Sequence, residues 1–520
     1  MSSFFAVALL TLMFFNTPDQ PPQGIGLAGM HQTIGRHSML RADALRKDLA
    51  TLRRSYELLH PGLYRYQTKA SMTARWDATD QYFSQDRSLA DAFLELTRLT
   101  AAVKCGHSYP NFWNQSARVA EALFEGHDRV PFHFRWLDRK MIVTGDHSGG
   151  ALPRGTQVLV IDGIETGLML DSLLPLARAD GANDHKRVAY LEVQGNPRWH
   201  AFDILRALRF PPRDTLITLK VRRPGERMTA SVVVRALTAG ERRTIGDRSK
   251  PDTGLASWHV SERETGSSGV AIIRMPTWSL YNAREAARVW TDSVLSDLEQ
   301  RRVSALILDL RENEGGIDAG NQFLAHLTSV KLPLPIYRRH VRYRVVPEDL
   351  LPFLSTWDST FRNWGADVQG PLDTVTHPLL ERLDLYRLTR WDDDPSGADV
   401  IHPVAPRYTG RVFVLIGAVN SSATFQFALA AKQTGLATLV GQSTGGNRRG
   451  INGGAFFFLR LRETGIEVDL PLVAGFPASP QPDAGIEPDV FVQPTIKQIT
   501  EGRDAELERA LELARTSRIR

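Results

Sequence analysis

The stretch Arg411-Val-Phe-Val-Leu-Ile-Gly-Ala-Val-Asn-Ser-Ser-Ala-Thr-Phe425 decides the fold of this chain. Its first six residues predict a buried strand, and a run of small and polar residues then leads directly into the helix-compatible segment 422–434. Apolar strands that alternate with helices are typical of an α/β domain whose sheet is covered on both faces. The stretch therefore predicts such a domain, with a serine at the start of one of its helices.

The same alternation continues on both sides of this stretch. Further strands are expected at 269–275, 304–310 and 437–441, with helices at 283–300 and 321–327. Residues 333–408, rich in Pro, Trp and Asp, interrupt the alternation and predict an insertion that forms a lid or a groove wall. The α/β domain is thus expected over 255–500, followed by a C-terminal helix over 501–520.

Two other patterns precede this domain. Apolar residues recur at helical spacing from about 38 to 104, which predicts a helical N-terminal domain over 30–118. Short strands predict a β-rich domain over 128–240, and their arrangement resembles a PDZ-like domain, which binds peptide ends by strand addition. An unrelated small barrel is the alternative interpretation of this region.

The composition excludes several classes of protein. A chain of 520 residues with 42% hydrophobic and 23% charged residues can form roughly three domains with ordinary cores. Its 63 basic and 58 acidic residues are interspersed, so the net charge of +5 does not indicate nucleic-acid binding. Cys105 is the single cysteine, which excludes an internal disulfide and a CxxC motif and argues against structural zinc.

The N-terminus carries an apolar run, Phe4 to Phe15, that suits the core of a signal peptide and is short for a membrane span. A Pro- and Gly-rich stretch follows it, up to Gly29. No Lys or Arg precedes the run, so a buried or anchoring helix is the alternative. Residues 1–29 are expected to be a signal peptide and linker, and the protein is expected to be periplasmic or secreted, with no stable membrane span.

Three segments carry residues suited to serine hydrolysis, which needs a hydroxyl, a base and N–H donors for an oxyanion. Ser422 lies at an expected helix N-terminus, where the helix dipole favours negative charge, although a simple N-cap is the alternative. Gly315 and Gly316 follow the carboxyl end of an apolar strand, where α/β sheets bind ligands. His107 lies in a loop after a helix, where a surface histidine is the alternative.

Together these segments resemble peptidase family S41, the C-terminal processing and tricorn-type proteases. Four elements carry the resemblance in order: Asp309-Leu-Arg-Glu-Asn-Glu-Gly-Gly, the serine stretch 414–425, Gly441-Gln-Ser-Thr-Gly-Gly and Gly485-Ile-Glu-Pro-Asp. The resemblance implies a multidomain α/β protein with a ClpP/crotonase-like catalytic core. It also implies that Ser422 is the nucleophile and that Ala423 N–H, with Gly315 or Gly316 N–H, holds the oxyanion.

The chain departs from the family pattern at two positions. The Glu that follows the family's serine by three residues is Phe425 here, and Asn447 stands where the processing proteases carry a lysine base. The neighbouring arginines have pKa values too high for a base. The resemblance to the tricorn-like branch then implies His107 as general base and later acid, although Gly106 replaces the serine that precedes the histidine there.

A carboxylate that orients His107 is expected at Asp483 or Glu487, although either could instead be a turn residue. Gly441-Gln-Ser-Thr-Gly445 also fits the G-x-S-x-G nucleophile elbow by its letters. That elbow must lead from a strand into a helix, whereas a loop and the apolar run 455–459 follow here, so Ser443 is not expected to be the nucleophile.

The sequence therefore predicts a serine peptidase that acts through an acyl-enzyme on a peptide or protein substrate. It needs no metal and no organic cofactor, and no nucleic-acid partner is expected. A noncatalytic peptide-binding protein on a degenerate S41 scaffold is the alternative, motivated by Phe425 and Asn447. An acyl-CoA enzyme of crotonase type would share the core architecture but leaves the combination of His107, Ser422 and a PDZ-like region unexplained.

Overall fold

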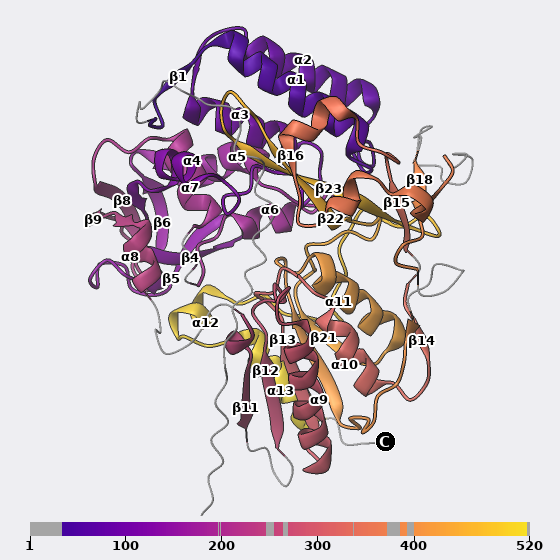
Figure 1. The fold of residues 1–520 in the computed structure, drawn as a ribbon. Coiled ribbons are helices and arrows are strands. Elements are labelled where there is room, and N and C mark those ends of the chain that lie inside the picture. The colour runs from indigo at the N-terminus through magenta and orange to yellow at the C-terminus, as the bar shows by residue number, and fades with distance from the viewer. Residues whose placement is uncertain are drawn as a thin grey trace, which may run out of the picture.

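The structure is a computed structural model that describes residues 34–516, except 196, 198, 246–253, 264–268, 336, 372–384 and 393–399. The expected signal peptide thus lies outside the described residues. Among the helices that are described, none is both long enough and apolar enough to cross a bilayer. Three larger sheets organise the described residues, and Figure 1 shows their arrangement.

The N-terminal part is helical. It comprises β1 (Met39–Leu40), α1 (Ala42–Leu59), α2 (Lys69–Tyr82), β2 (Arg87–Ser88), α3 (Leu89–Ala101) and α4 (Ala117–Phe124). The buried side chains of α1 include Leu45, Leu49, Leu52, Tyr56 and Leu59, which recur at helical spacing along one face. The loop after α3 leads from this helical layer to the candidate site.

The second part is an antiparallel sheet with the strand order β4-β5-β6-β8-β9. Its strands are β4 (Phe132–Leu137), β5 (Lys140–Asp146), β6 (Gln157–Ile161), β8 (Leu216–Arg222) and β9 (Ala230–Arg235), with the short strands β3 (His127–Arg129), β7 (Ile164–Glu165) and β10 (Leu237–Thr238) beside them. Its helices are α5 (Thr166–Leu173), η1 (Leu174–Leu176), α6 (Asp184–Tyr190), α7 (Ala201–Arg209) and α8 (Ala239–Thr244). The segment from η1 to α6 leaves this sheet and reaches the candidate site.

The third part is the expected α/β domain, in which the sheet order is β11-β12-β13-β20-β21-β24. Its strands are β11 (His259–Arg263), β12 (Val270–Arg274), β13 (Ala305–Asp309), β20 (Arg411–Ile416), β21 (Thr438–Gly441) and β24 (Val490–Phe491). Its helices are η2 (Leu255–Ser257), α9 (Arg284–Gln300), α10 (Ala319–Leu327), α11 (Ser422–Thr434), α12 (Ile496–Thr500) and α13 (Ala505–Thr516). All these strands pair in parallel except β11, which is antiparallel to β12.

Both faces of this parallel sheet are buried. Ala271 and Ile273 of β12 join a core with α9, α10 and α11, whereas Val270 and Ile272 join a second core with α13. A strand buried on both faces needs apolar residues at every position, which explains the continuous apolar runs in the sequence. The expected mixed α/β, multidomain fold is therefore confirmed.

A further sheet has the order β16-β22-β23-β15-β18-β17. It consists of β15 (Tyr337–Val341), β16 (Leu354–Ser355), β17 (Val368–Gln369), β18 (Tyr386–Leu388), β22 (Asn452–Arg460) and β23 (Glu467–Pro477). Close to it lie η3 (Glu348–Phe353), η4 (Ser359–Arg362) and η5 (Gly365–Asp367), and β14 (Leu332–Pro333) pairs with β19 (Val400–Ile401). The interruption at 333–408 therefore supplies four of the six strands of a sheet that the later hairpin β22–β23 completes.

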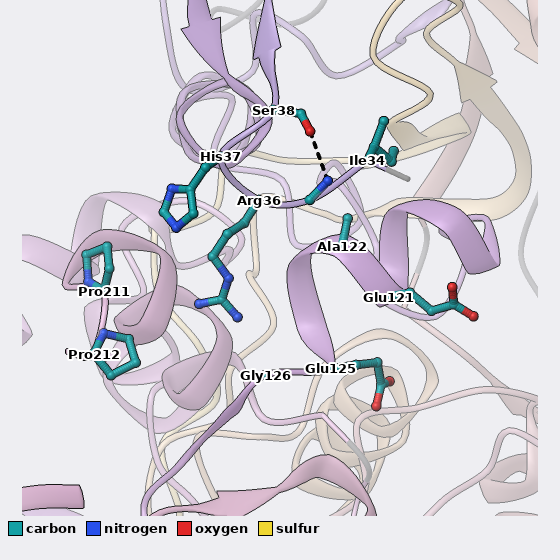
Figure 2. A pocket seen from close by; sticks show the side chains of 11 residues that line it. Ile34, Arg36, His37, Ser38, Glu121, Ala122, Glu125, Gly126, Pro211 and Pro212 are labelled. Carbon is teal, nitrogen blue, oxygen red and sulfur yellow. Dashed lines mark hydrogen bonds between the residues drawn. The ribbon is translucent and has the colours of Figure 1, made fainter. Parts of the chain in front are cut away.

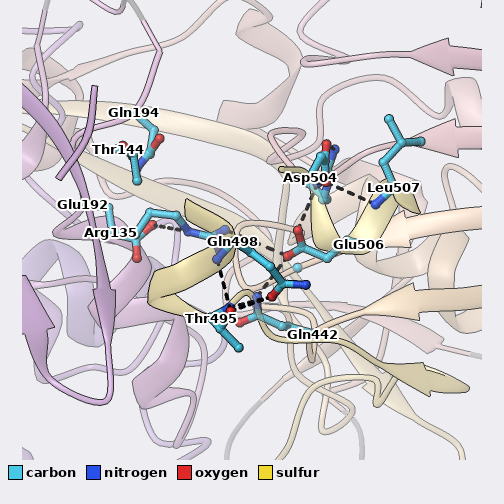
Figure 3. Close-up of polar contacts among 12 residues, drawn as sticks. Arg135, Thr144, Glu192, Gln194, Gln442, Thr495, Gln498, Asp504, Glu506 and Leu507 are labelled. Atoms are coloured by element: carbon cyan, nitrogen blue, oxygen red, sulfur yellow. Dashed lines mark hydrogen bonds and ion pairs between the residues drawn. The ribbon is translucent and has the colours of Figure 1, made fainter. Parts of the chain in front are cut away.

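This sheet packs on the N-terminal helices, and both contribute to one hydrophobic core (Figure 1). Tyr56 of α1, for example, donates its hydroxyl to the carbonyl of Asp469 in β23 at 3.1 Å. A separate polar contact joins the β-rich sheet to the α/β domain (Figure 3). There Arg135 lies 3.6 Å from Glu192 and 3.9 Å from Glu506, which also accepts from Gln442 at 3.2 Å.

Candidate active site

Ser422 lies at the turn between β20 and α11 and has an unusual backbone conformation. Its φ angle is 51°, in the left-handed region that residues other than glycine rarely adopt. A strained serine at a sharp strand-to-helix turn is typical of a nucleophile whose hydroxyl is held clear of the sheet. The neighbouring Ser421 donates its hydroxyl to Glu314 O at 3.1 Å, whereas Ser422 makes no side-chain hydrogen bond with any described residue. Neither hydroxyl caps the helix, so the N-cap interpretation finds no support.

Two buried asparagines hold this turn against the end of β13. Asn420 Nδ2 donates to the carbonyls of Leu310 at 2.5 Å and of Asn313 at 2.9 Å. Asn420 Oδ1 accepts from Gly417 N–H at 2.8 Å, and Asn313 Oδ1 accepts from the Thr424 hydroxyl at 2.8 Å. Buried amides whose hydrogen bonds are satisfied fix geometry strongly, so the carboxyl ends of two parallel strands are tied together under Ser422.

Gly315 and Gly316 face the serine turn and both require glycine. Their φ angles are 118° and 137°. A Cβ atom at Gly315 would lie 2.8 Å from Ser422 Cβ and 3.1 Å from Ala423 N, and one at Gly316 would lie 2.0 Å from Trp278 O. The two glycines therefore allow the backbone after β13 to approach the serine turn directly.

Only some of the expected oxyanion donors are free. Gly315 N–H donates to Asn313 Oδ1 at 2.9 Å, which corrects the expectation that it could serve as an oxyanion donor. Gly316 N–H has no acceptor among the described residues, and Ala423 N–H, in the first turn of α11, has none within its own helix. Gly316 and Ala423 are therefore the pair that remains available.

The His107 loop is held on both sides. Ser108 Oγ lies 2.8 Å from His60 Nε2 in the buried layer below the loop. Gly106 N–H donates to Asp180 Oδ1 at 2.8 Å, and Gly106 O accepts from Arg178 at 2.6 Å. Because the neighbours of His107 are fixed on both sides, its backbone is held in place.

The environment of His107 favours the neutral imidazole. Burial lowers the pKa of His107 below its usual value, and the nearby carboxylate of Asp180 opposes this shift. Nδ1 of His107 is buried without a hydrogen-bond partner, and the same holds for Oδ2 of Asp180. The ring also packs beside Phe456, with 5.7 Å between the ring centroids.

A partly buried ion cluster connects the histidine loop to the serine turn. Arg178, which binds Gly106 O, also donates to both carboxylate oxygens of Glu314 at 3.0 Å. Lys186 Nζ donates to Glu314 Oε1 at 2.6 Å and to Val419 O at 2.8 Å. Burial alone would raise the pKa of Glu314, but the two cations lower it, so the carboxylate stays ionised. Glu314 directly precedes Gly315, which places the three expected segments around one cluster.

The two carboxylates expected to orient His107 bind elsewhere. Asp483 Oδ1 accepts from Asn447 Nδ2 at 2.7 Å and from Ala182 N–H at 2.9 Å. Glu487 accepts from the Ser443 hydroxyl at 2.5 Å. No described hydrogen bond joins either of them to His107.

Asp180 is the carboxylate that the structure brings to the histidine, with an oxygen within 4.8 Å of a ring nitrogen of His107. Sequence reasoning missed it because a lone Asp within the β-rich region carries no motif. Its loop is supported from behind, since Asn447 Nδ2 lies 3.3 Å from Asp180 O and Asp483 holds the next turn of chain. The residue at the family's lysine position is thus a structural support for this loop.

Two other features do not locate the chemistry. β21 is followed by a loop and then by strand β22, not by a helix, so Ser443 lacks the elbow geometry. A surface pocket of about 740 Å³ lies between residues 34–38 and the end of α4 (Figure 2). Its lining contains Arg36, which pairs with Asp128 at 3.0 Å, and none of the residues around Ser422.

The class that this fold and this turn define is that of serine-type peptidases. Residues 269–490 match the model of peptidase family S41. The resemblance found in the sequence is thereby confirmed. No curated protein matches the chain in sequence.

Solved structures extend the likeness beyond the α/β domain. The structure of mature CPAF complexed with lactacystin is 16% identical, covers 91% of this chain and 98% of its own, and has a TM-score of 0.60. A structure of mature CPAF is 15% identical, covers 91% of this chain and 97% of its own, and has a TM-score of 0.58. At this identity the likeness concerns the fold alone. Because it covers 91% of the chain, it includes the helical and β-rich parts.

Proposed function

We propose that the chain is a serine endopeptidase or processing peptidase that cleaves peptide bonds through an acyl-enzyme on Ser422. The observation that carries this proposal is the left-handed φ of 51° at Ser422, in a turn where the adjacent serine is already committed to a hydrogen bond. Backbone strain of this kind costs about 1–3 kcal/mol and persists where surrounding contacts enforce it. The buried asparagines under the turn provide that enforcement.

The proposed reaction uses the residues around the turn. Ser422 Oγ attacks the substrate carbonyl carbon while its proton passes to Nε2 of His107, and the N–H groups of Gly316 and Ala423 stabilise the oxyanion. The peptide C–N bond then breaks, and the imidazolium gives its proton to the leaving amine. Water attacks the acyl-enzyme with the same histidine as base, which releases the acid and restores the serine.

His107 fits the role of base because burial lowers its pKa, so the ring is neutral and able to accept a proton near pH 7. Asp180 is the positioning residue that favours the imidazolium as it forms, in place of Asp483 or Glu487. Lys186 is the other basic group nearby, and burial lowers its pKa as well. Its ammonium donates to Glu314 and Val419 O, which leaves it without a role as base.

Two finer features of the fold belong to the same proposal. The α/β sheet is the ClpP/crotonase-like core, and the β4–β9 sheet is PDZ-like. Strand β9 ends the sheet order and carries Val233, whose side chain is 60% exposed, so an extended peptide has an edge to pair with. A periplasmic or secreted location is also part of the proposal, because residues 1–29 are expected to be a signal peptide and linker.

A noncatalytic peptide-binding protein is the second candidate, favoured by the loss of the family's Glu and Lys. Phe425 is 1% exposed and belongs to the hydrophobic core with α11, and Asn447 supports the Asp180 loop. Both replacements thus have structural roles, and neither removes the histidine. The two candidates differ in whether Ser422 is chemically reactive.

A fluorophosphonate probe tests this difference. Wild-type protein is expected to be labelled, and labelling and peptide cleavage are both expected to disappear in Ser422→Ala. Ser443→Ala is the matched control, because that serine pairs with Glu487 outside the site and its loss should leave labelling unchanged. His107→Ala should lower kcat/KM by about 10⁴-fold or more. A folded wild type that is neither labelled nor active on any peptide would establish the noncatalytic alternative.

A further inference from the structure

Three possible metal ligands lie close together, and the candidate base His107 is one of them. The thiol of Cys105, a ring nitrogen of His107 and a carboxylate oxygen of Asp180 all lie within 4.8 Å of one another. Cys105 is 1% and Asp180 2% exposed, whereas His107 is partly exposed. We propose that this cluster binds Zn²⁺, or another divalent cation that prefers sulfur and nitrogen ligands, and that the bound ion inhibits the peptidase. The inhibition rests on the proposed function, whereas the binding does not.

Two of the three clustered residues carry a buried polar atom that has no hydrogen-bond partner. Asp180 Oδ2 and His107 Nδ1 are both buried and have no hydrogen-bond partner. The other oxygen of Asp180 accepts from Gly106 N–H at 2.8 Å, so the carboxylate is anchored with one oxygen left free. Buried polar atoms normally have partners, and a cation between these two atoms would satisfy both.

The donor set suits zinc. Thiolate, imidazole and carboxylate are the side chains that bind Zn²⁺, and three protein ligands with one open position are a common arrangement. With the usual bond lengths, neighbouring tetrahedral ligand atoms lie about 3.3–3.6 Å apart. The observed spacing therefore requires each ligand to move inward by up to about 1 Å. Gly106 separates Cys105 from His107, and the exposed side of His107 leaves a route for the ion and a position for water.

Without a metal, the thiol of Cys105 stays protonated. Burial raises the pKa of Cys105 to about 11, and the sulfur accepts a hydrogen bond from Asn452 Nδ2 at 3.2 Å. Zinc binding would release the thiol proton to solvent and form a Zn–S bond in its place. The surrounding charges nearly balance, because Arg178 and Lys186 are offset by Asp180 and Glu314.

Inhibition follows from the chemistry of imidazole. A neutral ring has one N–H and one free lone pair. When Nδ1 donates its lone pair to zinc, the proton must reside on Nε2, which can then no longer accept a proton from Ser422. The ion also takes the carboxylate that favours the imidazolium. Zinc bound here would therefore lower kcat without competing for the substrate.

Cobalt(II) is the probe for the binding step. Full-length protein without an affinity tag is treated with chelator, dialysed and titrated with Co²⁺, and a thiolate-to-cobalt absorption band is expected in the near ultraviolet. Zn²⁺ should remove the band. Cys105→Ser, which keeps an acceptor for Asn452, and Asp180→Asn should each abolish it, whereas exposed His259→Ala should not change it. Cobalt binding without the band, or a band that survives Cys105→Ser, would overturn the proposal.

Activity measurements test whether the bound ion inhibits the peptidase. Cys105→Ser should keep the activity of the metal-free enzyme and require at least about tenfold more Zn²⁺ for half-inhibition, since losing a ligand weakens metal sites by that order or more. Chelator should restore the inhibited wild type. Equal zinc sensitivity in both proteins would refute the inhibitory role. If the metal-free wild type cleaves nothing, the proposed function fails, and the cobalt spectrum still decides whether the site exists.

Discussion

Replacing Gly315 with alanine should disable the site while leaving the fold largely intact. A Cβ atom there would lie 2.8 Å from Ser422 Cβ and 3.0 Å from Ser421 O, at a backbone φ of 118°. Ordinary carbon contacts begin near 3.5 Å, so the serine turn must retreat by roughly 1 Å. A misplacement of about 1 Å costs about 10²-fold in rate, or about 2.7 kcal/mol in the activation free energy.

Two other glycines separate the causes of this loss. Gly417 lies in the same turn, and its added Cβ would meet nothing within 4 Å, so Gly417→Ala should keep full activity. Gly435 ends α11 with a φ of 66° and equally open space, so Gly435→Ala imposes backbone strain without a clash at the serine. Gly435→Ala should lower the free energy of unfolding by about 1–2 kcal/mol and leave kcat unchanged.

The assay is kcat/KM on a fluorogenic peptide, together with the rate of fluorophosphonate labelling and thermal unfolding of each variant. Gly315→Ala should lose about 10²-fold in kcat/KM while remaining folded. Full activity in a folded Gly315→Ala protein would refute the close approach of the glycine turn to Ser422. An equal loss in Gly417→Ala would show that the turn is merely fragile.

Three further outcomes follow from the same structure. Asp180→Asn should lower kcat more than it changes KM. It should also move the acidic limb of the plot of kcat/KM against pH to lower pH, because Asp180 raises the pKa of His107 against the effect of burial. An unchanged pH profile would show that Asp180 has no part in the mechanism. Trp357, 52% exposed and 5.9 Å from Phe456 beside the histidine, should contribute to a subsite for apolar side chains. Trp357→Ala is expected to cost about tenfold in kcat/KM on peptides with large apolar residues and little on Ala or Gly peptides, and equal losses on both would contradict the subsite. Burial raises the pKa of Asp469 to about 7, so the folded state prefers the protonated acid. The protonated carboxyl therefore contributes fully to the free energy of unfolding below about pH 4, and this contribution is lost as the pH rises to about 7. Unfolding titrations of wild type and Asp469→Asn should therefore diverge over this range by up to about 4 kcal/mol, and parallel curves would rule this out.

Features encoded locally were open to prediction. The runs at 305–308 and 412–416 are apolar at every position because both faces of the sheet are buried, and that pattern can be read without knowing the neighbours. The glycine pair at 315 and 316 and the serine at 422 lie where chain direction changes between a strand and the next element. Such turns impose their own residue types, so the family signature survives in them.

Features that join distant segments were not open to prediction from the sequence. The composition of residues 333–408 predicts that they interrupt the alternation of strands and helices. Only the pairing between β15 and β23 shows that this region contributes to a separate sheet. The N–H of Gly315 was one of two alternative oxyanion donors expected beside that of Ala423, and in the fold it donates to the side chain of Asn313 two residues away. The orientation of a side chain within a turn depends on what the turn packs against, which local patterns do not record.

The sequence by itself determined the α/β core, the resemblance to a peptidase family and the serine, histidine and glycine segments, because these depend on periodicity and on residue types that a turn requires. Only the tertiary structure decided how they are connected. Arg178 and Lys186 reach Glu314 across 136 and 128 positions of chain, and Asp180 reaches the backbone of Gly106 across 74. Ion pairs and hydrogen bonds act through space and have no period along the chain, so the carboxylate proposed to serve His107 is found only once the chain is folded.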